Sequence, residues 1–357
     1  MIRKLSAALV AATVLSAGLA SADKPEKKGN ACEGVKHCIR FATLAPAKSP
    51  WGKHFTMWKE AAEQVSNKAE PNNLRVIWHW NGVEGPEDNV VGKIKSGQLD
   101  GAAVTAVGLA AIHEPINALQ MPGLFDSWDE LYKARDMLRP EFDEKLKAAG
   151  FYVSGWGDVG AAHTMSKGFA VHSPKDLKGA APAYLKGDKI APKVYETINS
   201  FLAEQKSPAL TPTPVEVMEI LPKLNAKAIN MLTTPALAAE QLQWTSRFDH
   251  INTQTVSYGV GAMVISQASL DKLPADMKDS MQSLGKKTSA LLAAKIRGED
   301  DLAFERTKKI MGANTYTPTA AEVGEFKKLW KGACVRATTA LAGGEILKRV
   351  KPDHCKK

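Results

Sequence analysis

The sequence predicts an α/β protein with two similar parts and a long helical segment near its end. Strand-like and helix-like segments alternate as β-α-β-α-β between residues 39 and 156, the order typical of a mixed sheet flanked by helices. The same alternation repeats after Gly160. The segment from Pro274 to Gly312 contains no internal proline. As one helix it would extend roughly 57 Å, enough to brace two lobes, although Gly285 could break it.

In the first part we expect strands over residues 39–44, 74–80, 101–105 and 151–156. Helices are expected over 50–68, 86–94 and 129–138, with the last broken at Pro140 and resumed to Gly150. Pro50 and Ser127 stand where helices start, and an internal proline removes a backbone hydrogen bond. The second part predicts helices over 188–202 and 214–223 and strands over 209–211 and 228–232.

Residues 1–22 read as a secretory signal. Arg3 and Lys4 form a basic start, residues 5–19 an apolar core, and Ala20-Ser21-Ala22 a small-residue cleavage site. The apolar run is too short to favour a membrane-spanning helix, and no Cys follows it directly as lipidation would require. We therefore expect an exported, soluble periplasmic protein. Removal of the two cations would lower the formal charge from +9 to +7, and a high pI on an exported protein indicates a solvated surface more than nucleic-acid binding.

The four cysteines lie in two outlying pairs, Cys32 with Cys38 and Cys334 with Cys355. In an oxidising compartment such pairs indicate disulfides, although three pairings are formally open. His37 and His354 each precede the second Cys of a pair, so a Cys2His2 zinc site is the alternative. Export favours the disulfides, and we expect no bound metal.

Several ordered segments resemble the DctP-like solute-binding proteins of tripartite ATP-independent periplasmic (TRAP) transporters. The segment 155–184 carries Gly-Trp and the turn "Pro-x-Asp-Leu-Lys-Gly" (Pro174–Gly179). The segment 81–125 carries "Ile-x-Ser-Gly-x-Leu-Asp-Gly" (Ile94–Gly101) and "Met-Pro-x-Leu-Phe" (Met121–Phe125). Residues 228–235 and 258–266 resemble the family's return strands. The resemblance covers about residues 39–345.

This resemblance implies a two-lobed periplasmic binding protein fold, with a mixed sheet and flanking helices in each lobe and a long C-terminal helix bracing both. It implies lobe I over 39–159 plus about 250–284, lobe II over 160–249 plus about 285–345, a tether over 23–38 and a tail over 346–357. It also implies a small-molecule ligand in the cleft and membrane-embedded permease subunits as partners. A subset of the family is associated with a periplasmic tetratricopeptide-repeat protein, and a similar partner is plausible here.

The family's usual carboxylate clamp is missing, which marks a divergent subset. Where the resemblance implies arginines, this chain has Ala162 and Ala183, and no Arg occurs between Arg139 and Arg247. The planar guanidinium binds carboxylates through two parallel hydrogen bonds, which Lys cannot reproduce. The sequence therefore predicts an apolar or weakly polar ligand instead of an organic acid.

Ligands of open α/β sheets bind beyond the carboxyl ends of the strands. The residues at or next to those predicted ends are the candidates for ligand binding: Trp51, Trp80, Asn81, Thr105, His163, Tyr184, Asn230 and Thr233. For Trp80, core packing is an equal alternative, and His163 is nearly as well explained as a structural histidine. Trp78 and Trp156 are interpreted as core residues.

Enzyme signatures are absent from the sequence, which contains no Gly-x-Ser-x-Gly, His-Glu-x-x-His or Walker loop. We expect neither catalysis nor a cofactor. The leading interpretation is the substrate-binding subunit of a TRAP-type transporter. The alternatives are a sensor module on the same scaffold and, with less support, an exported bilobal enzyme.

Overall fold

The strands form a single mixed sheet that runs through both halves of the chain. In the computed structural model, which describes residues 31–68 and 70–356, its order is β2-β1-β3-β8-β4-β7-β5-β6, with β9 paired to β8. The predicted signal lies outside the described residues. The strands are β1 (His37–Thr43), β2 (Leu74–His79), β3 (Gly101–Thr105), β4 (Phe151–Ser166), β5 (Pro182–Leu185), β6 (Thr213–Val215), β7 (Met231–Pro235), β8 (His250–Ser266) and β9 (Thr315–Tyr316).

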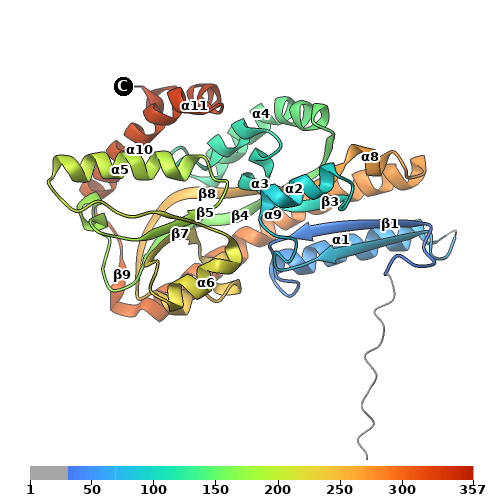
Figure 1. Ribbon diagram of the computed structural model, residues 1–357, viewed down its shortest axis with the longest axis horizontal. Helices are drawn as coiled ribbons and strands as arrows, with labels where there is room; N and C mark the ends of the chain where they lie inside the picture. Colours follow the sequence, from blue (N-terminus) through green and yellow to red (C-terminus); the bar gives the residue numbers. More distant parts are fainter. Residues whose placement is uncertain (1–30, 69, 357) are drawn as a thin grey trace, which may run out of the picture. The chain divides into compact units, whose positions relative to one another are not determined.

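Helices cover both faces of this sheet (Figure 1). They are α1 (Pro50–Ser66), α2 (Glu87–Lys95), α3 (Ala106–Ala110), α4 (Trp128–Ala148), α5 (Ile190–Glu204), α6 (Val217–Asn225), α7 (Ala236–Gln241), α8 (Gln267–Leu270), α9 (Ala275–Met311), α10 (Ala320–Ala340) and α11 (Gly344–Val350). The 3-10 turns are η1 (Glu114–Gln120), η2 (Pro174–Leu177), η3 (Thr245–Arg247), η4 (Gly312–Asn314) and η5 (Pro352–Cys355).

Two long strands join the halves. The first part of β4 pairs with the end of β8, which also pairs with β3, and the second part of β4 pairs with β7. Our prediction that β4 ends at Trp156 was wrong, because the strand continues through Gly157 and Gly160 to Ser166. Local irregularities in the β4–β8 register absorb this glycine-rich stretch. These two strands therefore belong to both halves of the sheet.

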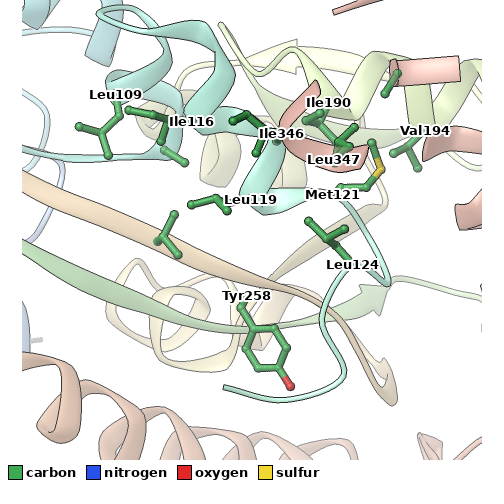
Figure 2. Packing of buried hydrophobic residues seen from close by; sticks show 14 of the residues in the cluster. Leu109, Ile116, Leu119, Met121, Leu124, Ile190, Val194, Tyr258, Ile346 and Leu347 are labelled. Atoms are coloured by element: carbon green, nitrogen blue, oxygen red, sulfur yellow. The ribbon is translucent and has the colours of Figure 1, made fainter. Parts of the chain in front are cut away.

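The two faces of the sheet bury two separate hydrophobic cores. Along β8, Val260 and Ala262 belong to one core and Met263 and Ile265 to the other, as expected from the alternation of side chains in a strand. On one side, here called the α5 face, the core receives residues of α2, α3, α4, α5, α10 and α11. On the other, the α9 face, it receives residues of α1, α6, α7 and α9. Figure 2 shows part of the α5-face core, which includes Met121 and Val194 of α5.

The long C-terminal helix is continuous. The suggestion that Gly285 breaks it was wrong, because α9 runs unbroken over 37 residues. Gly285 is buried, and a Cβ at this position would overlap the side chain and the backbone oxygen of Ser154 in β4. The glycine thus lets the helix approach the sheet closely.

The predicted break at Pro140 was also wrong. Helix α4 passes through this proline and buries Leu138 and Phe142 completely on either side of it. A proline costs about 3 kcal/mol within a helix, and burying two such side chains offsets that cost, since each contributes about 1.5–3 kcal/mol.

Both cysteine pairs are oxidised, as predicted. Cys334 of α10 bonds to Cys355, with the two Cα atoms 5.0 Å apart. Cys32 and Cys38 are also disulfide-bonded, and no described cysteine is free. Within the described part of the chain, no helix combines the length and the hydropathy that crossing a membrane requires.

Candidate ligand-binding cleft

A cavity of ≈360 Å³ lies where the strands of the two halves end. Thr43 and Thr105 reach it from the ends of β1 and β3, and Tyr184 and Thr233 reach it from β5 and β7. Asp158, in the middle of β4, lines it between the halves. This is the position at which ligands bind in open α/β sheets, and the volume lies in the range of small-molecule sites.

The lining carries no permanent positive charge. Among the described residues that form the wall of this cavity, none is Lys or Arg. His54 is the one imidazole in that lining, and burial lowers its pKa, which favours the neutral ring. The carboxyl groups of Glu87, Asp158 and Asp188 do line the cavity, and each is bonded within the protein.

The Glu87 carboxyl group accepts hydrogen bonds at the start of α3. Its Oε1 accepts from the backbone N–H of Thr105 at 2.7 Å, and its Oε2 accepts from the Gly108 N–H at 2.9 Å and from the Thr105 hydroxyl at 2.5 Å. Burial raises the pKa of Glu87, and these hydrogen bonds oppose that rise. Because the Glu87 carboxyl group accepts from the N–H groups of Thr105 and Gly108, these two donors are not available to a ligand.

Side-chain oxygens also accept from backbone N–H groups at the starts of three other helices around the cleft. Asp188 Oδ1 accepts from Ile190 N–H at 2.8 Å and Ala191 N–H at 3.2 Å at the start of α5. Ser49 Oγ accepts from the backbone of α1, and Asp300 of α9 accepts from Leu237 N–H in α7 at 2.9 Å. Helix N-termini commonly bind anions through such N–H groups. Here the protein's own oxygens occupy them.

Asp158 is the centre of a buried network between the lobes. Its Oδ1 lies 2.9 Å from Nη1 of Arg135, and its Oδ2 accepts a short hydrogen bond from the Tyr132 hydroxyl. The guanidinium groups of Arg135 and Arg297 lie 4.6 Å and 5.3 Å from the centroid of the Tyr132 ring. The charge of Asp158 is thus neutralised inside the protein. Its backbone oxygen accepts from Trp51 Nε1 at 3.2 Å, which fixes that indole at the cleft wall.

The two alanines that replace the expected arginines both line the cleft. Ala162 and Ala183 are 6% and 4% exposed. Two lysines of the same part of the chain form ion pairs elsewhere: Lys167 pairs with Asp249 at 3.1 Å and Lys186 with Glu216 at 3.8 Å, both at exposed positions. The positions of the missing clamp are therefore apolar parts of the wall.

Four of the eight predicted site residues line the cleft: Trp51, Thr105, Tyr184 and Thr233. Tyr184 is half-buried and lies 5.8 Å from the ring of Tyr195, which also lines the cavity. Thr233 is exposed in the middle of β7. The structure brings these residues together, with both lobes contributing.

Trp80 and Asn81 do not line the cavity. Trp80 stacks on Trp78 of β2, with ring centroids 5.3 Å apart, and belongs to the packing of the α9 face. Asn81 is exposed in the following turn with a positive φ of 60°. Trp78 is buried as predicted. Trp156 is also buried, but part of it reaches the cleft wall.

His163 and Asn230 also lie away from the cleft lining. In β4, Ala162 and Thr164 line the cavity and His163 between them points to the opposite side, because side chains alternate. His163 stacks on Phe304 of α9 at 4.1 Å and donates from Nδ1 to the Gln254 carbonyl, while burial lowers its pKa to about 4. Asn230 Oδ1 accepts from Ala181 N–H at 2.7 Å.

Sequence reasoning missed several residues of the wall. They are the capping acids Glu87 and Asp188, the network acid Asp158, and the aromatic residues Trp244, Phe326 and Trp330. An acid at the start of a predicted helix was a usable signal for Asp188, because such residues cap helices, whereas Glu87 bonds at the start of α3, far from its own place in the sequence. The aromatic residues gave no local signal, since their exposure to the cavity depends on tertiary packing.

Comparison with known proteins places these features in a family. Residues 41–336 match the model of the DctP family, bacterial extracellular solute-binding protein family 7. A solute-binding protein of Chromohalobacter salexigens is 27% identical over 147 residues, which are 41% of this chain and 42% of the relative. The chain therefore matches less than half the length of this curated relative.

Solved structures share the fold at low sequence identity. The sugar acid binding protein DctPAm of Advenella mimigardefordensis, in complex with galactonate, superposes with a TM-score of 0.78 at 16% identity, over 89% of this chain and 99% of that protein. A TRAP periplasmic solute-binding protein of Sulfurospirillum deleyianum, with bound succinate, gives a TM-score of 0.78 at 15% identity over the same shares. Together with the family match over most of its length, the two-lobed fold shows that this chain belongs to the DctP family of bacterial extracellular solute-binding proteins.

Proposed function

We propose that this protein is the periplasmic substrate-binding subunit of a TRAP-type transporter and that it captures a neutral, apolar or weakly polar molecule. The observation that carries the ligand class is the cleft wall, in which the described residues include no Lys or Arg. A buried carboxylate without a charged or hydrogen-bonding partner costs several kcal/mol. An acid would find no guanidinium among the described lining residues, and side-chain carboxyl groups already accept from the N–H groups of Thr105 and Ile190.

Capture proceeds by closure of the two lobes around the ligand. In this structure the halves approach each other at two points beside the cleft. A Cβ on Gly82 would lie 3.8 Å from Met218 Cγ, and one on Gly187 would lie 3.2 Å from Val107 Cγ1. A ligand that contacts both walls favours the closed form over the open one, which is the thermodynamic basis of closure. The closed protein then delivers its ligand to membrane-embedded permease subunits. A tetratricopeptide-repeat partner stays a prediction.

The related proteins were solved with a different class of ligand from the one proposed here. DctPAm was solved with galactonate and the Sulfurospirillum deleyianum protein with succinate, both of which are carboxylates. At the positions where the family resemblance implies arginines, this chain presents the methyl groups of Ala162 and Ala183 to the cleft. The proposal therefore keeps the family's mode of capture and changes the chemistry of what is captured.

Thermal melting tests the ligand class. We expect succinate and galactonate to leave the melting temperature unchanged, and neutral lipophilic compounds to raise it by mass action, with about 2.7 kcal/mol of added stability at a ligand concentration of 100 Kd. Native mass spectrometry of protein purified from its own periplasm identifies the natural ligand. A shift with succinate and none with neutral compounds contradicts the proposal.

A matched pair of variants isolates the missing arginine. Ala162→Arg places a guanidinium in the cleft, where it should destabilise the unliganded protein because its charge is buried without a partner. Succinate should restore part of that stability. Ala162→Met adds similar bulk without charge and should not respond to succinate. Equal responses of the two variants would contradict the role assigned to the missing charge.

A further inference from the structure

The cavity extends beyond the space between the lobes. Its wall includes Val194 and Ile198 of α5 and Phe326, Leu329 and Trp330 of α10. These five residues are 4–8% exposed and belong to the α5-face core. They thus line a space that continues from the cleft into the core of the second half, between the sheet and helices α5 and α10. We call this space the α5 arm.

The arm has a defined place in the fold. Helices α5 and α10 pack against each other on one side of the sheet (Figure 1). Figure 2 shows Val194 and Ile190 on α5 within the α5-face core. The ring of Tyr184, at the end of β5, lies 5.8 Å from that of Tyr195 on α5.

The chemistry of the arm is that of a hydrocarbon site. Its five defining side chains are aliphatic or aromatic. Two polar residues of the cavity wall are engaged elsewhere. Asn252 Nδ2 donates to the Val171 carbonyl at 2.8 Å, and its Oδ1 accepts from Gln254 N–H at 2.8 Å. Asp188 is held by the start of α5. Chain-like apolar groups gain from such a space by leaving water, whereas a polar group would lose its hydration without replacement.

We propose that the ligand is an elongated amphiphile, with a neutral polar head between the lobes and an aliphatic tail in the α5 arm. The head lies beside the side chains of Tyr184 and Thr233, which both line the cavity, whereas the Thr105 hydroxyl already donates to Glu87. The tail extends between Val194, Ile198 and Trp330. This inference rests on the proposed function and narrows it from apolar molecules in general to molecules with a flexible chain.

Chain length tests the arm directly. Straight-chain 1-alkanols from butanol to decanol serve as probes, with affinity measured by calorimetry or thermal shift. In the wild type we expect the affinity to rise about fourfold with each added methylene until the arm is filled. No dependence on chain length would overturn the proposal. The proposed function would still hold after such a result, provided that a compact neutral compound such as cyclohexanol bound and succinate did not.

A plugged arm provides the second test. Ile198→Trp fills the arm from α5, and it should abolish the gain from longer chains while butanol binding persists. Ala203→Trp is the matched control, because this exposed position lies on the same helix away from the core. Val194→Phe, a smaller plug, replaces Ile198→Trp if that variant fails to fold. An unchanged chain-length dependence in a folded plug variant would overturn the proposal.

Fluorescence locates the tail. An ω-bromo-octanol carries a heavy atom at the chain end, and bromine quenches indole emission on contact. We expect Trp330→Phe to remove most of the quenching by this probe. Trp244→Phe is the control, because Trp244 also lines the cavity but belongs to the core of the α9 face. Loss of quenching in Trp244→Phe and its retention in Trp330→Phe would place the tail on the wrong side of the sheet and overturn the assignment.

Discussion

At the scale of single residues, Trp80 contributes to packing and not to ligand binding. Its ring stacks on Trp78 and lies outside the cleft wall. We expect Trp80→Ala to lower the free energy of unfolding by about 2 kcal/mol, less than for a fully buried Trp because the ring is partly exposed. Urea unfolding of the ligand-free variant measures this loss. Ligand affinity per folded molecule should be unchanged.

Thr233→Ala is the comparison for Trp80→Ala. Thr233 lines the cleft and is exposed, so its replacement should weaken ligand binding and leave the unfolding midpoint nearly constant. A Trp80→Ala protein that unfolds like the wild type but no longer binds ligand would restore Trp80 to the site and contradict the packing interpretation.

Asp300 gives the protein a pH-dependent stability. This carboxyl group is 3% exposed and accepts from Ala161 N–H at 2.7 Å and from Leu237 N–H at 2.9 Å. Burial raises its pKa from the ordinary 3.8 to about 6, against the effect of both hydrogen bonds. The folded protein thus binds this proton more readily than the unfolded chain. Stability from this group is full below about pH 4 and is lost as the pH rises through about 6.

Urea unfolding between pH 4 and pH 7 measures the effect, which amounts to roughly 3 kcal/mol over that window. Asp300→Asn cannot titrate, and its amide N–H₂ faces a backbone donor. We therefore expect it to be less stable than the wild type at pH 4, with the difference narrowing toward pH 7. Stability curves that run parallel for the two proteins would show that Asp300 does not titrate in this range.

At the scale of elements, the strand β4 depends on the conformation of Gly160. Its φ of +140° is unfavourable for other residues, and a Cβ there would lie 2.5 Å from Pro235 Cβ and 2.7 Å from Asp300 Oδ2. We expect Gly160→Ala to cost about 3 kcal/mol or more of unfolding free energy. Denaturant unfolding checks this, and ligand affinity should fall as well, because the strand connects the two lobes.

Gly157→Ala is the matched control in the same strand. An added Cβ at Gly157 would meet only Leu292 Cδ2, at an ordinary 3.7 Å. The expected change in unfolding free energy is within about 1 kcal/mol. Equal losses in the two variants would mean that any side chain in this part of β4 is harmful, and the argument from Gly160 would be wrong.

Local signals predicted many elements well and failed where contacts are distant. Helix α1 begins at Pro50 as predicted, and β3 has the predicted bounds, because proline, glycine and strand-forming residues mark these ends. The length of β4 was not predictable in this way, since its glycines look like a turn until β8 pairs with them. The role of Asp300 depends on a hydrogen bond to a residue 139 positions away.

The same limit applies to the site. Ala162 and Ala183 were identified from their places in family motifs, and both line the cleft. His163 was a candidate because it is adjacent to Ala162 in sequence, yet adjacency in a strand means opposite faces. Phe326 and Trp330 line the cavity only because α10 packs against α5. This contact between distant segments cannot be predicted from a local sequence pattern.

At the scale of the whole molecule, the disulfide between Cys334 and Cys355 anchors the end of the chain. It closes a loop with a sequence separation of 21 and joins α10 to the tail that follows α11. Replacing both cysteines with alanine should lower the free energy of unfolding by about 3 kcal/mol, chiefly because the unfolded chain gains freedom. Urea unfolding measures it, and reductant should destabilise the wild type more than the double variant.

The outcome that contradicts this prediction is a double variant as stable as the oxidised wild type. The disulfide at Cys32 and Cys38 closes a shorter loop, so removing it should have a smaller effect. A larger loss from that pair would point to a structural role for the N-terminal bond that loop length does not explain.

The occupation of backbone donors at helix starts around the cleft has a consequence for the medium in which the protein works. Dissolved anions such as phosphate and chloride can compete only where unpaired donors or fixed cations attract them, and here Glu87, Asp188, Ser49 and Asp300 already occupy those donors. Occupancy of the cleft should therefore hardly depend on ionic strength, since no counter-ions are displaced on binding. A protein with such a cleft distinguishes between solutes by the free energy needed to dehydrate them. It selects a solute first by the free energy of removing that solute from water, and only then by its shape.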